Sequence, residues 1–173
     1  MKLKNLASIL LVLATVGCSS TTANPSNNSI YPTPIVRTSF FCAKDLNSIP
    51  TTYAQTQRGR VSVIKWISQY FSNAGFNPET RCQEVSSQFQ KLYNEGKLNY
   101  LSAGRKNNQL IICGLSASNG DCEQLFTLKP GEDAGRILQH LREIATGKAS
   151  GPMFASNQII NLNEFLQKAP VEP

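Results

Sequence analysis

The segment Ser62-Val63-Ile64-Lys65 has the S-x-x-K spacing with which penicillin-recognising enzymes place a serine nucleophile beside a lysine. Those enzymes carry the two residues one turn apart on a helix, whereas this segment has the β-branched composition of a strand. On a strand, positions i and i+3 point to opposite faces of the sheet, so Ser62 and Lys65 would not meet. Because the companion K-T-G motif is also absent from the sequence, we interpret the match as chance.

The only histidine, His140, falls on the polar side of a predicted helix beside Arg136 and Glu143. Any serine or cysteine nucleophile would have to take its base from this one residue. Glu132 and Asp133 precede the same helix, where carboxylates complement the positive helix end, with weak cation binding as the alternative. The cysteines show no C-x-x-C spacing that would suggest zinc. The sequence therefore predicts no catalytic residue, no cofactor and no metal site.

The N-terminus has the composition of an export signal. Lys2 and Lys4 form a positive region, and the run 6–16 that follows contains eleven apolar or small residues. Eleven residues are too few to cross a bilayer, which takes about 20 in a helix. The segment ends at Gly17-Cys18, which resembles the bacterial lipobox, although Thr15 departs from its preferred leucine. We therefore predict a lipoprotein signal peptide over 1–17, with lipidation of Cys18.

The alternative is an ordinary signal peptide cut near Thr21-Thr22-Ala23, which would discard Cys18. In either case a linker follows, since fourteen of the twenty residues 19–38 are Ser, Thr, Asn or Pro. Such a segment cannot bury enough apolar surface to order itself. We expect a lipid anchor and flexible tether over 18–38, and an exported protein anchored to a membrane that faces the periplasm or the cell exterior.

The remaining four cysteines form an even set, which in an exported chain predicts two disulfides with three possible pairings. We prefer Cys113 with Cys122, because this pair flanks a turn-rich loop and would face across a hairpin. Cys42 then pairs with Cys82.

Alternating and helical patterns indicate the elements of the folded part. In the predicted strand 60–67, Val61, Val63 and Ile67 share one face while Ile64 and Trp66 share the other, which favours a central strand with Trp66 in the core. The predicted strands are 40–42, 52–57, 60–67, 98–103, 109–115 and 125–129, and the predicted helices run from Asn77 to before Gly96, over 134–145 and from Asn161 onward. This order predicts an α+β fold: a mainly antiparallel sheet with two amphipathic helices and a short C-terminal helix packed on one face. We expect one globular domain over 39–168 and a tail over 169–173.

Charge is low for a soluble chain, at 16% of residues, and the formal net charge is +6. Removal of 1–17 leaves fifteen basic and eleven acidic residues, a net charge of +4. Two predicted hairpin tips could form a patch for anionic glycans, lipid head groups or an acidic protein, with dispersed solvated charges as the alternative; they carry Arg58, Arg60, Arg105 and Lys106. No nucleic-acid motif is present, so we expect no nucleic-acid partner.

Several ordered segments together resemble the circadian oscillating protein (COP) domain family of cyanobacteria, over residues 39–167. They are Phe40-Phe41-Cys42, Gly59 to Trp66, Asn77 to Gln90, Leu98 to Gly114, Leu125 to Gly131 and Ser150-Gly151-Pro152. The resemblance implies a small envelope-associated domain in an exported protein, with structural cysteines and no catalytic residues to transfer.

These observations predict an envelope protein that a lipid anchors to the membrane. It would act by binding, or by structural interaction with, a protein or anionic glycan partner in the envelope. The alternative is an envelope hydrolase or lyase with an unrecognised site. That alternative requires a cleft that brings together at least two of a small set of titratable residues, namely Lys65, Arg81, Glu132, Asp133 and His140.

Overall fold

The computed structural model describes residues 37–146 and 159–172 of the chain. The strands are β1 (Ser39–Lys44), β2 (Pro50–Thr56), β3 (Gly59–Lys65), β4 (Tyr100–Lys106), β5 (Gln109–Leu115), β6 (Glu123–Thr127), β7 (Ile160–Asn161) and β8 (Val171–Glu172). The helices are α1 (Pro78–Asn94), α2 (Ala134–Thr146) and α3 (Leu162–Lys168), with a 3-10 turn η1 (Ser72–Ala74). The predicted α+β class is confirmed, but the strands divide between two sheets.

Both sheets are antiparallel and have four strands. The first sheet has the order β1-β2-β3-β8, and the second has the order β6-β5-β4-β7. The β4–β5 turn is made by Asn107 and Asn108, which both have positive φ, as a two-residue hairpin turn requires. Each sheet therefore consists of a local three-stranded meander completed by a two-residue strand from the C-terminal segment.

The predicted strand 60–67 is too long, because β3 ends at Lys65 and Ile67 is 72% exposed. The pairing with β2 shifts register at Thr52, so Val63 is an extra residue between two paired neighbours. Such a bulge breaks the strict alternation of faces from that point on. Val63 and Trp66 are consequently both buried, and Ile67 turns outward.

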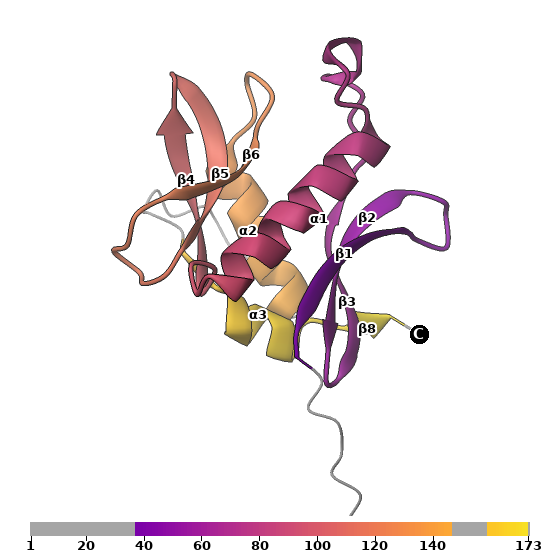
Figure 1. Ribbon diagram of the computed structural model, residues 1–173, viewed down its shortest axis with the longest axis vertical. Coiled ribbons are helices and arrows are strands. Elements are labelled where there is room, and N and C mark those ends of the chain that lie inside the picture. The colour runs from indigo at the N-terminus through magenta and orange to yellow at the C-terminus, as the bar shows by residue number, and fades with distance from the viewer. Residues whose placement is uncertain (1–36, 147–158, 173) are drawn as a thin grey trace, which may run out of the picture. The chain divides into compact units, whose positions relative to one another are not determined.

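Helix α1 begins next to Asn77, where the sequence predicts its start, and Asn77 is its N-cap: the side chain accepts a hydrogen bond from the Thr80 N–H at 2.9 Å. The helix lies between β1 of the first sheet and β6 of the second (Figure 1). Gln90 Oε1 accepts from the Phe40 N–H of β1 at 2.7 Å, and Gln88 Nε2 donates to the Gln124 carbonyl of β6 at 3.1 Å. Side chains of α1 thus form hydrogen bonds with backbone groups on the edge strands β1 and β6. Unpaired groups on an edge strand can form hydrogen bonds with another chain.

The C-terminal segment 159–172 joins the two sheets on their other edges. β7 pairs with β4, α3 follows, and β8 pairs with β3 through Val61 and Val171 (Figure 1). The sequence analysis placed 169–173 in a tail, whereas Ala169 is fully buried and residues 171–172 form β8. A two-residue strand carries no detectable alternation, and backbone pairing holds it in place.

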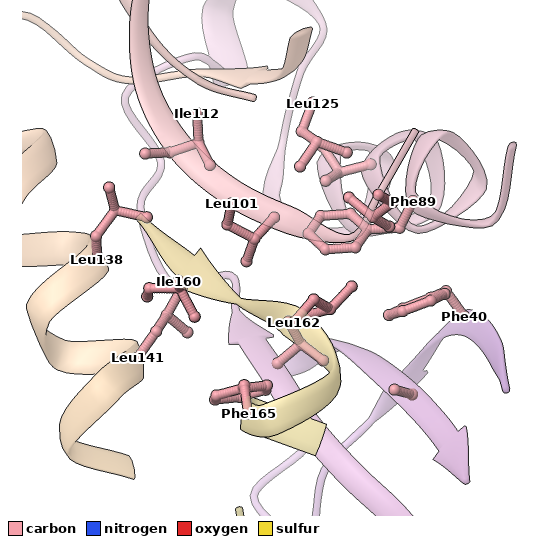
Figure 2. Packing of buried hydrophobic residues seen from close by; sticks show 14 of the residues in the cluster. Phe40, Phe89, Leu101, Ile112, Leu125, Leu138, Leu141, Ile160, Leu162 and Phe165 are labelled. Carbon is pink, nitrogen blue, oxygen red and sulfur yellow. The ribbon is translucent and has the colours of Figure 1, made fainter. Parts of the chain in front are cut away.

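The core is continuous across both sheets and all three helices. Figure 2 shows side chains from the second sheet, α1, α2 and the C-terminal segment meeting around Leu101, with Phe165 and Leu162 supplied by α3. Two disulfides add covalent links: Cys42–Cys82 joins β1 to α1, and Cys113–Cys122 joins β5 to the residue before β6. These are the pairs that the sequence analysis preferred.

The disulfides favour an oxidising, extracytoplasmic location. The predicted signal peptide, Cys18 and nearly all of the predicted tether lie outside the described residues. None of the helices described here is long and apolar enough to cross a bilayer.

Candidate functional site

A cleft of about 930 Å³ lies between β3, one face of the second sheet and α2, and β8 forms a further wall. Its walls are mainly apolar, and its side chains come from β3 and the residues that follow it, from β6 and the residues after it, and from α2. The apolar residues at these walls include Ile64, Trp66, Phe126, Leu128, Ile137, Leu141 and Ile144. Phe126, Ile137 and Ile144 are only partly buried, so the cleft presents apolar surface to solvent. Its volume falls within the range of small-molecule sites.

Trp66 is fixed in one orientation at the wall of the cleft. Its indole Nε1 donates to Thr52 Oγ1 at 2.9 Å, and the same hydroxyl accepts from Ser86 Oγ at 3.0 Å. Its ring meets Phe126 edge-on, with 5.4 Å between centroids. Only 5% of Trp66 is exposed, so its predicted place in the core is confirmed. The ring still borders the cleft, and so connects the core to the site.

Arg81 projects from the first turn of α1 into the same cleft. Its guanidinium stacks 4.6 Å from the centroid of Trp66 and 4.7 Å from that of Phe71, and Nη2 donates to the Thr127 carbonyl at 3.2 Å. Burial lowers the pKa of Arg81, and the charge of Glu132 partly offsets this. Among the described residues, no carboxylate lies within 4.0 Å of this guanidinium. The cleft therefore holds a partly desolvated positive charge without an ion pair.

Four of the five titratable residues that an enzyme would need border the cleft: Lys65, Arg81, Glu132 and His140. The structure thus meets the condition set for the enzyme alternative. The other three besides Arg81, however, each lie close to an oppositely charged or hydrogen-bonding residue that is not one of these five. Lys65 Nζ lies 2.7 Å from Asp45, which raises the pKa of Lys65; Glu132 lies 3.6 Å from Lys129; and His140 lies 3.8 Å from Glu143.

Asp133, the fifth residue, does not line the cleft and instead caps α2. Its Oδ1 accepts from the N–H groups of Gly135 at 2.8 Å and Arg136 at 3.2 Å. The prediction that this carboxylate complements the helix end is confirmed. Within the described ranges, no three His, Cys, Asp or Glu side chains come together as metal ligands.

The four cations of the predicted anion patch lie on hairpins of different sheets. Arg58 donates to the carbonyls of Leu166, Gln167 and Ala169 at the end of α3. Arg60 stacks 4.7 Å from the Tyr53 ring and lies 4.0 Å from Glu172. Both arginines of the first sheet therefore contact the protein's own chain.

Arg105 and Lys106, by contrast, are exposed beside the β4–β5 turn. The anion patch stays a prediction, and its accessible part is this second hairpin.

The family model of circadian oscillating protein COP23 matches residues 39–167. The chain belongs to this family. The match extends from the first residue of β1 into α3, and so includes every wall of the cleft except the one formed by β8. No curated protein and no solved structure matches the chain.

In this COP23 domain the sequence analysis missed the cleft itself. Apolar residues on both faces of 60–67 predict a strand buried on both sides, but the face that carries Ile64 borders the cleft. The same pattern fits both situations, because a half-open apolar cleft and a closed core require the same residue types. The position of Arg81 depends on the packing of α1 against residues 66–71, which no local pattern encodes.

Proposed function

We propose that this COP23 protein is a lipid-anchored binding protein of the cell envelope, which holds its ligand in the cleft between β3 and α2. The observation that carries the proposal is the cleft, with apolar walls, the partly buried guanidinium of Arg81 and a volume of about 930 Å³. Binding sites for small molecules combine a largely apolar lining with a few placed polar groups in this way.

The N-terminal sequence supports the anchor. A positive region, an apolar run of eleven residues and Gly17-Cys18 are features of a lipoprotein signal, from which Thr15 departs, and the two disulfides suit the compartment to which such a signal leads. Lipid chains on the cysteine sulfur and amine would anchor the protein stably, since more than one chain is needed. The segment 18–38 would then let the domain stand roughly 25 Å or more from the membrane.

Cell fractionation tests the anchor. The variant Cys18→Ala should move the protein from the membrane fraction to the soluble fraction, whereas Ser19→Ala should leave it in the membrane fraction. A protein that is soluble without any substitution, with a mature N-terminus near residue 23, would show an ordinary signal peptide. An unchanged membrane fraction in Cys18→Ala would likewise exclude lipidation as the anchor.

Fluorescence of a neutral apolar dye, N-phenyl-1-naphthylamine, tests the cleft. We expect the dye to brighten with the full chain, and Ile137→Arg to abolish the effect because it places a charge at the partly buried wall. Leu46→Arg is the matched control, since Leu46 is 91% exposed and does not border the cleft. Equal brightening with Ile137→Arg would exclude the cleft as the site.

The enzyme alternative remains a second candidate because Lys65, Glu132 and His140 border the cleft. It predicts hydrolysis of ester or cell-wall glycan substrates that is lost in His140→Ala. The binding proposal predicts no turnover by the purified chain, and equal dye binding in His140→Ala, whose ring is largely exposed.

A further inference from the structure

The guanidinium of Arg81 has hydrogen-bonding capacity that the protein does not use. An arginine side chain carries five N–H donors, and in the described part of the chain only Nη2 makes a hydrogen bond, to the Thr127 carbonyl. The guanidinium is partly buried, and within the described residues its close contacts are two aromatic rings and this one carbonyl, with no carboxylate within 4.0 Å. An anion that enters the cleft would supply a charged partner.

Two aromatic rings fix how such an anion would be met. The guanidinium carbon lies over the rings of Trp66 and Phe71, at 4.6 and 4.7 Å from their centroids, so the rings restrain the guanidinium and leave its N–H edge as the side on which an anion would bind. A planar fork held in this way matches the two oxygens of a carboxylate. A lysine ammonium group at the same place would be a point charge, without this preference for two oxygens in one plane.

The charge around the cleft favours a ligand with one negative charge. Three carboxylates border the cleft, namely Glu132, Glu143 and Glu172. They would repel a dianion such as a phosphate monoester more strongly than a carboxylate. Of the described cations that border the cleft, Lys65 is paired with Asp45 and Arg136 is exposed, so Arg81 is the partly buried one that can meet a single anionic charge.

The rest of the cleft requires an apolar body. Besides Arg81, the cleft is lined by Ile64, Phe126, Ile137 and Ile144, all of which are only partly buried. Covering this surface with a hydrocarbon chain would remove it from water. We propose that the ligand is an amphiphile with an apolar body and one carboxylate, which Arg81 binds; this inference rests on the proposed function of the cleft.

Paired titrations test the carboxylate. Laurate and dodecanol share a twelve-carbon chain, and both would be added below the micelle concentration to the full chain carrying Cys18→Ser, so that no attached lipid competes. Trp66, the only tryptophan, reports occupancy through its fluorescence. We expect laurate to bind at least about tenfold more tightly than dodecanol, since a charge-assisted hydrogen-bonded pair contributes at least this factor.

Two arginine variants locate the effect. Arg81→Gln should weaken laurate binding about tenfold and leave dodecanol binding unchanged, which also shows that the cleft is intact. Arg136→Gln makes the same chemical change at an exposed arginine that borders the same cleft, and should change both affinities less than twofold. An equal loss of laurate binding in both variants would show general charge attraction and overturn the role of Arg81.

The wild-type comparison stands even if Arg81→Gln does not fold. Equal affinities for laurate and dodecanol would overturn the carboxylate inference while supporting the cleft as a binding site. No binding of either compound, or of the neutral dye, would overturn the inference and the proposed function together.

Discussion

The two sheets are secured to α1 by different means. In the first sheet, Cys42–Cys82 links β1 directly to the helix and closes a sequence separation of 40 residues. In the second sheet, Cys113–Cys122 spans only 9 residues and stays within its own meander. The second sheet meets α1 through side-chain hydrogen bonds, from Arg81 and Gln88 to carbonyls of β6, and through the shared core.

This difference bears on the cleft, which has walls from both sheets. The wall at β3 belongs to the sheet that a disulfide joins to α1, whereas the second sheet and α2 contact α1 only through noncovalent interactions among the described residues. Noncovalent contacts open locally at lower free energy than a covalent link permits. We therefore expect the second sheet and α2, and not β3, to adjust when a ligand enters.

The largest effect should come from removing the long-range link. Replacing both cysteines, Cys42→Ala with Cys82→Ala, should lower the free energy of unfolding by about 4 kcal/mol, since the unfolded chain regains the entropy of a loop of roughly 40 residues. Urea unfolding followed by circular dichroism measures this change. A loss below 1 kcal/mol would mean that the first sheet does not depend on the link.

Removing the short link should cost less. The pair Cys113→Ala with Cys122→Ala frees a loop of about 10 residues, for which the same entropy relation gives about 2.6 kcal/mol. The same urea titration, run alongside the first pair, gives the difference between the two sheets directly. A larger loss here than in the Cys42/Cys82 variant would reverse the comparison.

Gly104 sharpens the description of the second sheet, because it lies against the short disulfide. A Cβ at this position would fall 2.6 Å from Cys122 Sγ, too close for two unbonded atoms. Gly104→Ala should therefore destabilise the protein by about 1–3 kcal/mol, as overpacking does. The cost should shrink in the Cys113→Ala, Cys122→Ala background, and an unchanged cost in that double-mutant cycle would contradict the contact.

The smallest effect concerns the noncovalent tie of β8 to the first sheet. The Tyr53 hydroxyl donates to Glu172 at 2.7 Å, and burial followed by this hydrogen bond raises the pKa of Tyr53 to about 12. Tyr53→Phe should cost about 1 kcal/mol at pH 7.

The pH dependence follows from the direction of this pKa shift. Because the folded protein holds the proton more tightly than the unfolded chain, the stabilisation is complete below pH 10 and is lost as the pH rises through about 12. Urea midpoints of the wild type should fall in this window relative to Tyr53→Phe. A constant difference between the two proteins up to pH 12 would exclude the effect.

Local signals in the sequence predicted most of the elements. Asn77 and Asn161 cap the helices that follow them, because an N-cap is a contact between neighbours in sequence. The pairing of the cysteines also agrees with the structure, since a nine-residue separation around a turn favours a hairpin link. The N-caps and the Cys113–Cys122 link depend on residues close together in the chain. The Cys42–Cys82 link then follows because only two of the four cysteines are left.

The division into two sheets could not be predicted in the same way. Alternation shows that a segment is a strand and which face is apolar, but not which strands pair. β8 shows this limit, because only two residues pair with β3 and the contacts that hold them are remote in sequence. The cleft depends on this division, so its walls were not apparent from the sequence either.

The C-terminal segment also determines when the fold can close. Residues 160–172 are synthesised after β3 and β4, yet β7 and β8 supply the last strand of both sheets. Pairings between segments far apart in sequence form late, because a long loop must close first. While the ribosome is still elongating this chain, both sheets therefore lack their last strand. A chain that has not completed its fold can still pass through an export channel in an extended form.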